Sequence, residues 1–116
     1  MIHEITDETF EKEVVNSSVP CVITFTAGWC TFCNTMTPKL EQVADTFGDN
    51  VKFCLVNIDD QKKLRIKFAV AAVPYIVLVA DGMQTPLFDE IVTAERLEER
   101  IRFVLDGGNA PTSRPL

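Results

Sequence analysis

Short apolar runs alternate along the chain with segments in which apolar residues recur every three or four positions. The first pattern is typical of buried strands and the second of amphipathic helices. We predict strands over residues 2–5, 19–26, 51–58, 75–80 and 85–92. We predict helices after residue 7, from about residue 30 to 47, from 61 to 68 and from 94 to 106.

Residues that cap helices or form turns mark the ends of these elements. Thr6 or Asp7 can cap the first helix, and the pair Asp59–Asp60 can cap the short third helix. The Asp-Gly dipeptide at 81–82 is a tight-turn signal. We therefore expect the strand over 85–92 to return antiparallel beside the strand that precedes it.

The order of the elements indicates an α/β domain with helices on both faces of a central sheet. Strands separated by helices imply a parallel core with right-handed crossovers, and the Asp-Gly hairpin adds an antiparallel edge. We expect this one domain to occupy residues 1–108. Residues 109–116 contain two prolines and no hydrophobic pattern, so we predict that they form a disordered tail.

The composition is that of an ordinary globular domain, with 116 residues of which 47% are hydrophobic and 24% charged. The formal net charge of -6 argues against nucleic acid and anionic membrane surfaces as partners, because both attract basic proteins. No apolar run is long enough to cross a bilayer. The first residues do not resemble a secretory signal, so we expect a cytoplasmic protein.

The residues that carry chemistry are Trp29-Cys30-Thr31-Phe32-Cys33, where a buried strand ends and a helix begins. Cysteines at this spacing can bring their Cα atoms within disulfide range, roughly 4.4–6.8 Å. The unpaired N–H groups and the dipole of the helix N-terminus stabilise a thiolate at Cys30. We therefore expect Cys30 to be the attacking sulfur and Cys33, one turn later, to be the more buried resolving sulfur.

The same two cysteines could instead supply half of a zinc site, which needs four ligands. The other candidate ligands are Cys21, Cys54 and His3. Cys21 lies at the opposite end of its strand, roughly 16 Å away, and Cys54 lies early in a neighbouring strand. We therefore expect no metal, and we interpret Cys21 and Cys54 as small core hydrophobes, although neighbouring strands could bring them close enough for a structural disulfide.

The sequence resembles the thioredoxin family over nearly its whole ordered length. The resemblance rests on residues 25–33 (Phe-Thr-Ala-Gly-Trp-Cys-x-x-Cys), on Pro38, on residues 57–59 (Asn-Ile-Asp) and on Val73-Pro74 before a strand. It implies the thioredoxin fold, a central mixed sheet of about five strands in the order 1-3-2-4-5. It also implies a cis peptide bond before Pro74, beside the two cysteines.

The resemblance further implies a thiol–disulfide oxidoreductase, most directly a protein-disulfide reductase, with a role in electron transport and cell redox homeostasis. Its redox-active group would be the Cys30–Cys33 disulfide, with no bound cofactor. Its partners would be disulfide-containing proteins and a flavin-dependent thioredoxin reductase or another dithiol donor, and we expect a monomer. The substrate-docking residues that it implies are Trp29, Val73, Pro74 and Tyr75.

Several positions depart from the family pattern. Thr31-Phe32 replaces the family's Gly-Pro. Phe32 keeps a backbone N–H that proline lacks, and a hydrogen bond from it to the Cys30 thiolate would favour the reduced form and so give a more oxidising couple. Thr24 replaces a buried Asp that helps to deprotonate the resolving cysteine, and Leu55 replaces its Lys companion. Glu90 replaces a docking-face glycine, where its charge would narrow the range of partners. A second family Trp is also replaced, by Thr26.

These departures leave two alternatives to the reductase. One is a non-catalytic binding module on the thioredoxin fold, in which the dithiol is a redox-sensitive latch. The other keeps the enzyme but reverses the electron flow, which gives an oxidase or an isomerase.

Overall fold

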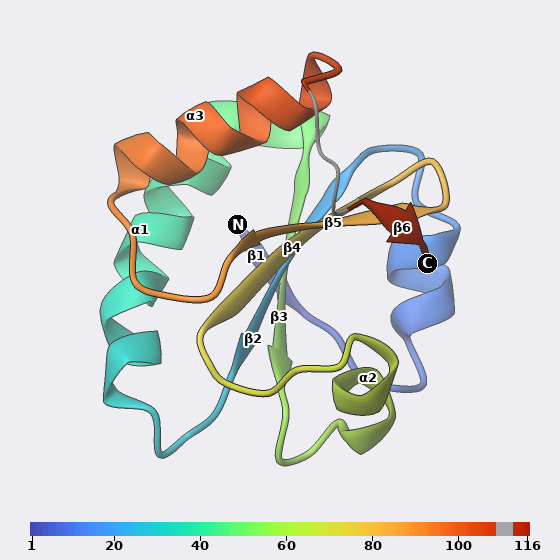
Figure 1. Cartoon of the computed structure of the whole chain (residues 1–116), viewed down its shortest axis with the longest axis vertical. Coiled ribbons are helices and arrows are strands. Elements are labelled where there is room, and N and C mark those ends of the chain that lie inside the picture. The colour runs from blue at the N-terminus through green and yellow to red at the C-terminus, as the bar shows by residue number, and fades with distance from the viewer. Residues whose placement is uncertain (109–112) are drawn as a thin grey trace.

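The computed structural model describes residues 1–108 and 113–116, and within them a six-stranded mixed sheet forms the centre of the fold (Figure 1). The strand order is β1-β3-β2-β4-β5-β6. The first three strands pair in parallel, and each of the other three pairs antiparallel with its neighbour. The strands are β1 (Ile2–Glu4), β2 (Cys21–Thr26), β3 (Lys52–Asn57), β4 (Tyr75–Ala80), β5 (Met83–Phe88) and β6 (Arg114–Pro115).

Helices cover both faces of this sheet. α1 (Thr31–Phe47) and α3 (Ala94–Leu105) lie on one face, to the left in Figure 1. The short π-type helix η1 (Glu11–Val15) and α2 (Lys62–Lys67) lie on the other face, and the 3-10 turn η2 (Gly48–Asn50) follows α1. Within the described ranges, none of these helices has the length and apolar character that a membrane span requires.

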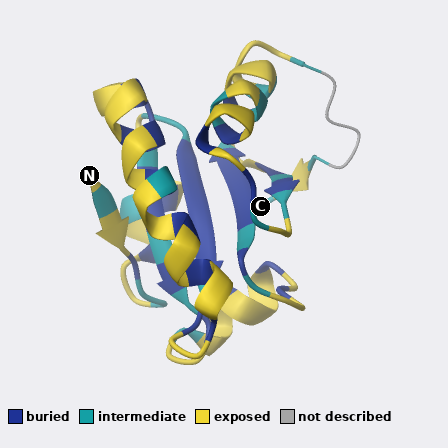
Figure 2. Ribbon diagram, turned by 90° about the vertical axis from the view of Figure 1, so that its left-hand side faces the viewer, coloured by how far each residue is buried: buried dark blue, intermediate teal, exposed yellow. Residues whose placement is uncertain are grey.

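The two central strands, β2 and β4, are buried on both faces, which explains their nearly unbroken apolar sequences. In β2, Ile23 and Phe25 point into the core layer under η1 and α2, whereas Val22 joins the layer under α1 and α3. In β4, Val77 and Ile76 divide between the two layers in the same way. Figure 2 shows the buried central strands behind helices whose outer faces are exposed. Each buried side chain of this size contributes roughly 1.5–3 kcal/mol to stability.

The predicted α/β sheet with helices on both faces and the order 1-3-2-4-5 is confirmed, with β6 added at its edge. The pattern-based prediction that β4 joins a parallel core is wrong, because β4 pairs antiparallel with β2. The connection over residues 58–74 contains only the short helix α2, and it brings the chain back at the same end of the sheet where β3 ends. Asn57 faces Thr26 and Tyr75 faces Phe25, so β4 must run in the direction opposite to β3.

A distant side chain, rather than a neighbouring one, caps α2. The N-cap residue Gln61 makes no side-chain capping bond. The carboxylate of Asp7 instead accepts hydrogen bonds from the N–H groups of Lys63 (3.3 Å) and Leu64 (3.0 Å). The amide oxygen of Gln61 in turn accepts a bond of 2.8 Å from the Asp7 N–H. The predicted cap at Asp59–Asp60 is therefore wrong, because the folded chain supplies the acceptor from another segment.

Thr6 caps the first helical turn, and it is one of the two residues, Thr6 and Asp7, that the sequence predicted for this cap. Its Oγ1 accepts a hydrogen bond from the Thr9 N–H (3.2 Å), while Thr9 Oγ1 accepts one from the Thr6 N–H (2.9 Å). This reciprocal pair satisfies two N–H groups that a helix start leaves without partners, in the manner of a capping box. Asp7 is thereby left to cap α2.

The end of the chain differs from the prediction of a disordered tail. Residues 109–112 lie outside the described residues, but Arg114–Pro115 form β6 against the start of β5. The Leu116 N–H donates to the Gly82 carbonyl (2.9 Å), and the Leu116 side chain packs against the core layer under η1. Without β6, β5 would be an edge strand with unpaired backbone N–H and C=O groups. Pairing with these groups does not require apolar side chains, so the hydrophobic pattern of the tail does not predict it.

Replacing Asp7 with Ala is expected to lower the free energy of unfolding by about 0.5–2 kcal/mol, because α2 then loses the acceptor of its first N–H groups. Urea unfolding followed by circular dichroism measures the change. Asp60→Ala is the matched control, since Asp60 is an exposed carboxylate at the position where the sequence predicted the cap. We expect the control to change stability by less than about 0.5 kcal/mol, and equal effects of the two substitutions would contradict the assignment.

Candidate active site

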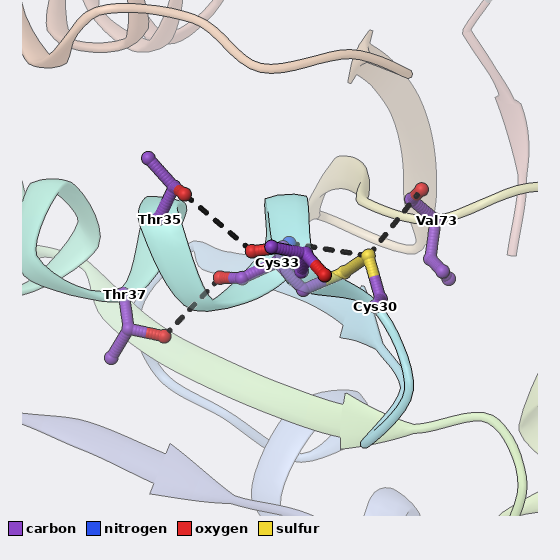
Figure 3. Close-up of a disulfide and its surroundings, with 6 residues drawn as sticks. Cys30, Cys33, Thr35, Thr37 and Val73 are labelled. Carbon is purple, nitrogen blue, oxygen red and sulfur yellow. Dashed lines mark hydrogen bonds between the residues drawn. A yellow bond between two sulfur atoms is a disulfide. The ribbon is translucent and has the colours of Figure 1, made fainter.

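The junction between β2 and α1 is held by a sulfur cap. The Cys30 N–H donates to the Ala27 carbonyl (3.1 Å), which turns the chain away from β2. Cys30 is the N-cap residue of α1, and its Sγ accepts a hydrogen bond from the Cys33 N–H at 3.2 Å (Figure 3). The sequence predicted that N–H groups of the helix N-terminus would stabilise Cys30 but singled out none at Cys33, although bonding from the N-cap to the third helical residue is the usual capping pattern.

Cys30 and Cys33 are joined as a disulfide, with their Cα atoms 5.3 Å apart. In this oxidised form the two residues differ little in exposure, at 5% for Cys30 and 4% for Cys33. The predicted difference in burial, with Cys33 the more buried, amounts to only one percentage point in this form. The asymmetry lies in hydrogen bonding instead, because the Sγ of Cys30 is the one at the helix N-terminus that accepts an N–H.

The loop before β4 lies against this disulfide. The Val73 carbonyl oxygen is 3.8 Å from the Sγ of Cys30 (Figure 3), and the Val73–Pro74 peptide bond is cis. Tyr75 follows as the first residue of β4, opposite Phe25 in the register, and the two rings are 5.8 Å apart. Partial burial raises the pKa of Tyr75, so its phenol stays protonated at neutral pH. The structure thus brings residues 73–75 to the two cysteines.

Large apolar side chains stand in solvent around the disulfide. Trp29 is 69% exposed and Phe32 is 63% exposed, and Val73, whose carbonyl lies against Cys30, is half-buried. We call Trp29, Phe32 and Val73 the apolar rim. Single exposed apolar residues are common on protein surfaces, but here two large aromatic side chains are exposed within two residues of the same cysteine.

The replaced family positions Thr24 and Leu55 are direct neighbours. They face each other in the parallel register of β2 and β3. Thr24 is buried at 2% exposure and Leu55 is half-buried. A hydroxyl and an aliphatic side chain therefore occupy adjacent places where the family has an acid and a base.

Glu90 lies in the segment between β5 and α3, which Figure 1 shows beside α1. Glu90 is exposed. The ammonium of Lys39, on α1, donates to the Val92 carbonyl (3.2 Å) and ties this segment to the helix that begins at the disulfide. β5 ends at Phe88 rather than at residue 92 as predicted, because polar residues at 89–90 leave the sheet.

Cys21 and Cys54 lie apart from the disulfide, in the core layer under η1, and each is 1% exposed. Both thiols are free. Hydrogen bonding from the Cys54 thiol lowers the pKa of Cys21 to about 7, and the same bond, together with burial, raises the pKa of Cys54. Because solvent does not reach either sulfur, we interpret both as core residues in spite of the low pKa of Cys21.

His3 is exposed on the edge strand β1, where it faces Cys54 in the register. Two strands, β3 and β2, separate β1 from β4. Among residues 1–108 and 113–116, no group of three or more His, Cys, Asp or Glu side chains is arranged to hold a metal ion. The zinc alternative therefore gains no support from the described parts of the chain.

A CxxC disulfide at the junction of a central strand and a helix defines a class, the thiol–disulfide oxidoreductases of this mixed-sheet fold. The family model described as thioredoxin matches residues 1–103. Thioredoxin from Rickettsia bellii is 32% identical over 84 residues, which are 72% of this chain and 80% of that protein. Thioredoxin from Haemophilus influenzae is 36% identical over 78 residues, 67% of this chain and 73% of that protein. The chain belongs to the thioredoxin family, whose members are thiol–disulfide oxidoreductases.

A solved structure extends the likeness to three dimensions. The crystal structure of chloroplastic thioredoxin z superposes with a TM-score of 0.80 and covers 92% of this chain and 96% of that chain, at 23% sequence identity. At this level of identity the comparison bears on the fold alone, and it confirms the thioredoxin fold that the resemblance implied.

Proposed function

We propose that this chain is a protein-disulfide reductase in which Cys30 is the nucleophile and Cys33 the resolving cysteine. The Cys30 thiolate attacks a substrate disulfide, forms a mixed disulfide and releases one substrate thiolate. The Cys33 thiolate then attacks the sulfur of Cys30, closes the 30–33 disulfide and releases the second substrate thiolate. The substrate gains two electrons and the dithiol loses two. The observation that carries these roles is the hydrogen bond from the Cys33 N–H to the Sγ of Cys30 at the helix N-terminus.

The surroundings of the disulfide support an extended protein substrate. The apolar rim of Trp29, Phe32 and Val73 offers contact area beside the sulfur. In addition, Glu90 places a negative charge on the segment next to α1, which disfavours partners with an acidic residue there. The proposed partner range is accordingly narrow.

The oxidised form needs an external donor to complete a cycle. We propose a flavin-dependent thioredoxin reductase or another dithiol, acting in the cytoplasm. The residues described here supply the exchange chemistry by themselves, and the proposal involves no bound cofactor.

The Cys33→Ser variant tests the proposal, because it stops the reaction at the mixed disulfide. We expect it to retain several proteins from an oxidised extract as covalent adducts, which dithiothreitol releases and mass spectrometry counts. Cys30→Ser is the matched control and should trap none of them. If the same single partner is retained by both variants without a covalent bond, the chain is a binding module and the reductase is excluded.

Phe32 bears on the reduction potential. The first helical turn of α1 contains N–H groups that have no intrahelical acceptor, and the Phe32 N–H is one of them. The family's proline at this position has no N–H. A thiolate at Cys30 can accept from the Phe32 N–H as well as from the Cys33 N–H, which stabilises the reduced form and raises the potential.

Phe32→Pro should lower the reduction potential by about 30–60 mV, because a hydrogen bond to a charged acceptor is worth about 1.5–3 kcal/mol and 1.4 kcal/mol corresponds to about 30 mV. Redox titration against dithiothreitol buffers, read by thiol labelling, measures the change. Phe32→Ala keeps the N–H and removes only the ring, so its potential should stay near that of the unsubstituted protein. A potential that is unchanged or raised in Phe32→Pro would overturn the argument.

Thr24 and Leu55 occupy the family positions that affect the second step of the proposed reaction, the attack of Cys33 on the mixed disulfide. A buried thiol resists ionisation, so attack by Cys33 is helped by a nearby group that can take its proton. The Thr24 hydroxyl can donate or accept a hydrogen bond but cannot take a proton at neutral pH. We therefore propose that release of the substrate from the mixed disulfide is slow in this chain.

Thr24→Asp should speed the release of product from a preformed mixed disulfide by about tenfold or more at neutral pH, since a carboxylate can act as general base. Single-turnover release of a fluorescent thiol measures the rate. Thr24→Val is the matched control and should give no acceleration. Because an acid at a buried site costs stability, the double variant Thr24→Asp/Leu55→Lys keeps the test valid if Thr24→Asp alone unfolds. No acceleration in either would sink the proposal.

A further inference from the structure

One flank of α3 carries two arginines that the exchange site does not use. Arg96 and Arg100 are one helical turn apart and line a groove between α3 and β5. The groove has a volume of about 520 Å³. Its walls are Leu87, Phe88, Arg96, Glu99, Arg100 and Phe103. We call it the α3–β5 groove.

Each guanidinium lies over an aromatic ring of the same groove. The Cζ of Arg96 is 5.5 Å from the centroid of the Phe88 ring, and the Cζ of Arg100 is 6.0 Å from that of Phe103. Such a contact restrains the guanidinium but leaves its N–H edge free to donate. Both arginines are therefore preorganised to bind an oxygen acceptor.

Within the described residues, no hydrogen bond or ion pair links either guanidinium to an acceptor. Among residues 1–108 and 113–116, the ion pairs involve other side chains, and the Nε of Arg100 is buried without a hydrogen-bond partner. Because this Nε is buried, an acceptor from outside the chain would be bound by the terminal nitrogens of the guanidiniums, which are not among the buried atoms without a partner.

The other walls limit which acceptor fits. Phe103 is 49% exposed, and Leu87 and Phe88 add apolar surface, so a ligand with apolar groups beside its charge is favoured. The charged residues that line the groove are two arginines and one glutamate, Glu99. The groove is thus a locally positive site on a chain of formal net charge -6, and it is complementary to a short acidic segment.

One end of the groove lies near the exchange site. Phe88 faces Ile76 in the register of β4 and β5, and Ile76 is two residues beyond Pro74. From Arg96 to Phe103 the groove then follows α3 for about 10 Å. A polypeptide held at the apolar rim can therefore extend into it.

We propose that the α3–β5 groove docks an acidic, partly apolar segment of a protein substrate, with carboxylates bound by Arg96 and Arg100. This inference rests on the proposed reductase function and adds to it a surface that selects among substrates. The carboxylates accept charge-assisted hydrogen bonds from the free guanidinium edges, and the apolar residues between them contact Phe88 and Phe103.

A fluorescein-labelled peptide of alternating glutamate and leucine is the probe, and fluorescence anisotropy measures its dissociation constant. We expect Arg96→Gln/Arg100→Gln to weaken binding by about tenfold or more, and Glu99→Gln to strengthen it. The matched control is Lys62→Gln/Lys63→Gln, which makes the same charge change at exposed positions of α2 and should change binding less than about twofold. Equal weakening by the two double variants, or no binding to the unsubstituted protein, would overturn the proposal.

Arg96→Lys/Arg100→Lys guards against misfolding, because it keeps both charges while losing the planar fork, and it should also bind more weakly than the unsubstituted protein. Binding as tight as that of the unsubstituted protein would show that only net charge matters and would count against the groove.

Reduction of hydroxyethyl disulfide, a small neutral substrate, separates the groove proposal from the reductase proposal. If the protein reduces it but does not bind the peptide, the groove proposal fails alone. If the peptide binds in the groove but no disulfide is reduced, the reductase proposal fails, and with it the claim that the segment belongs to a substrate.

Discussion

Burial of β2 and β4 on both faces is the constraint on which the exchange site depends. A one-residue shift of either strand would move side chains such as Phe25 or Val77 from the core layer under η1 and α2 into the layer under α1 and α3, where the close-packed interior has no space shaped for them. The strand ends are therefore fixed. β2 delivers Cys30 to the start of α1, and β4 holds the Val73 carbonyl 3.8 Å from its sulfur. The geometry of the site is thus a consequence of the core rather than of the loops that carry the residues.

What the sequence could and could not predict follows from the range of the interactions involved. The strands, the main helices and the CxxC junction depend on periodicity and spacing, which are local, and they were predicted. The capping of α2 by Asp7 was missed because it joins residues more than fifty positions apart. The direction of β4 was missed because it depends on the end of the sheet at which residues 58–74 return the chain, and β6 was missed because it depends on the free edge of β5. In the site, the two cysteines were found from spacing, whereas the pairing of Thr24 with Leu55 required the register.

That pairing makes the departures from the family pattern physically consistent. An acid and a base that face each other inside a sheet stabilise each other's charge, and the loss of only one would leave a buried charge without its partner. In this chain Thr24 and Leu55 face each other instead, and neither carries a charge. Replacement of both family residues removes the cost of desolvating two buried charges, and it also removes the carboxylate that could accept a proton. The sheet at this position is therefore easier to bury, and it has no side chain that could take a proton from a thiol at neutral pH.

Different parts of the molecule carry the exchange chemistry and the selection of partners. The donor to the Cys30 sulfur is a backbone N–H, so the exchange chemistry tolerates changes in the surrounding side chains. If the proposals above hold, selectivity falls to exposed residues, namely the apolar rim, Glu90 and the α3–β5 groove. Because the chain as a whole is negative, an acidic partner is repelled at long range and attracted only when its carboxylates reach the guanidiniums. Discrimination among partners would therefore arise from contact geometry, not from electrostatic steering during approach.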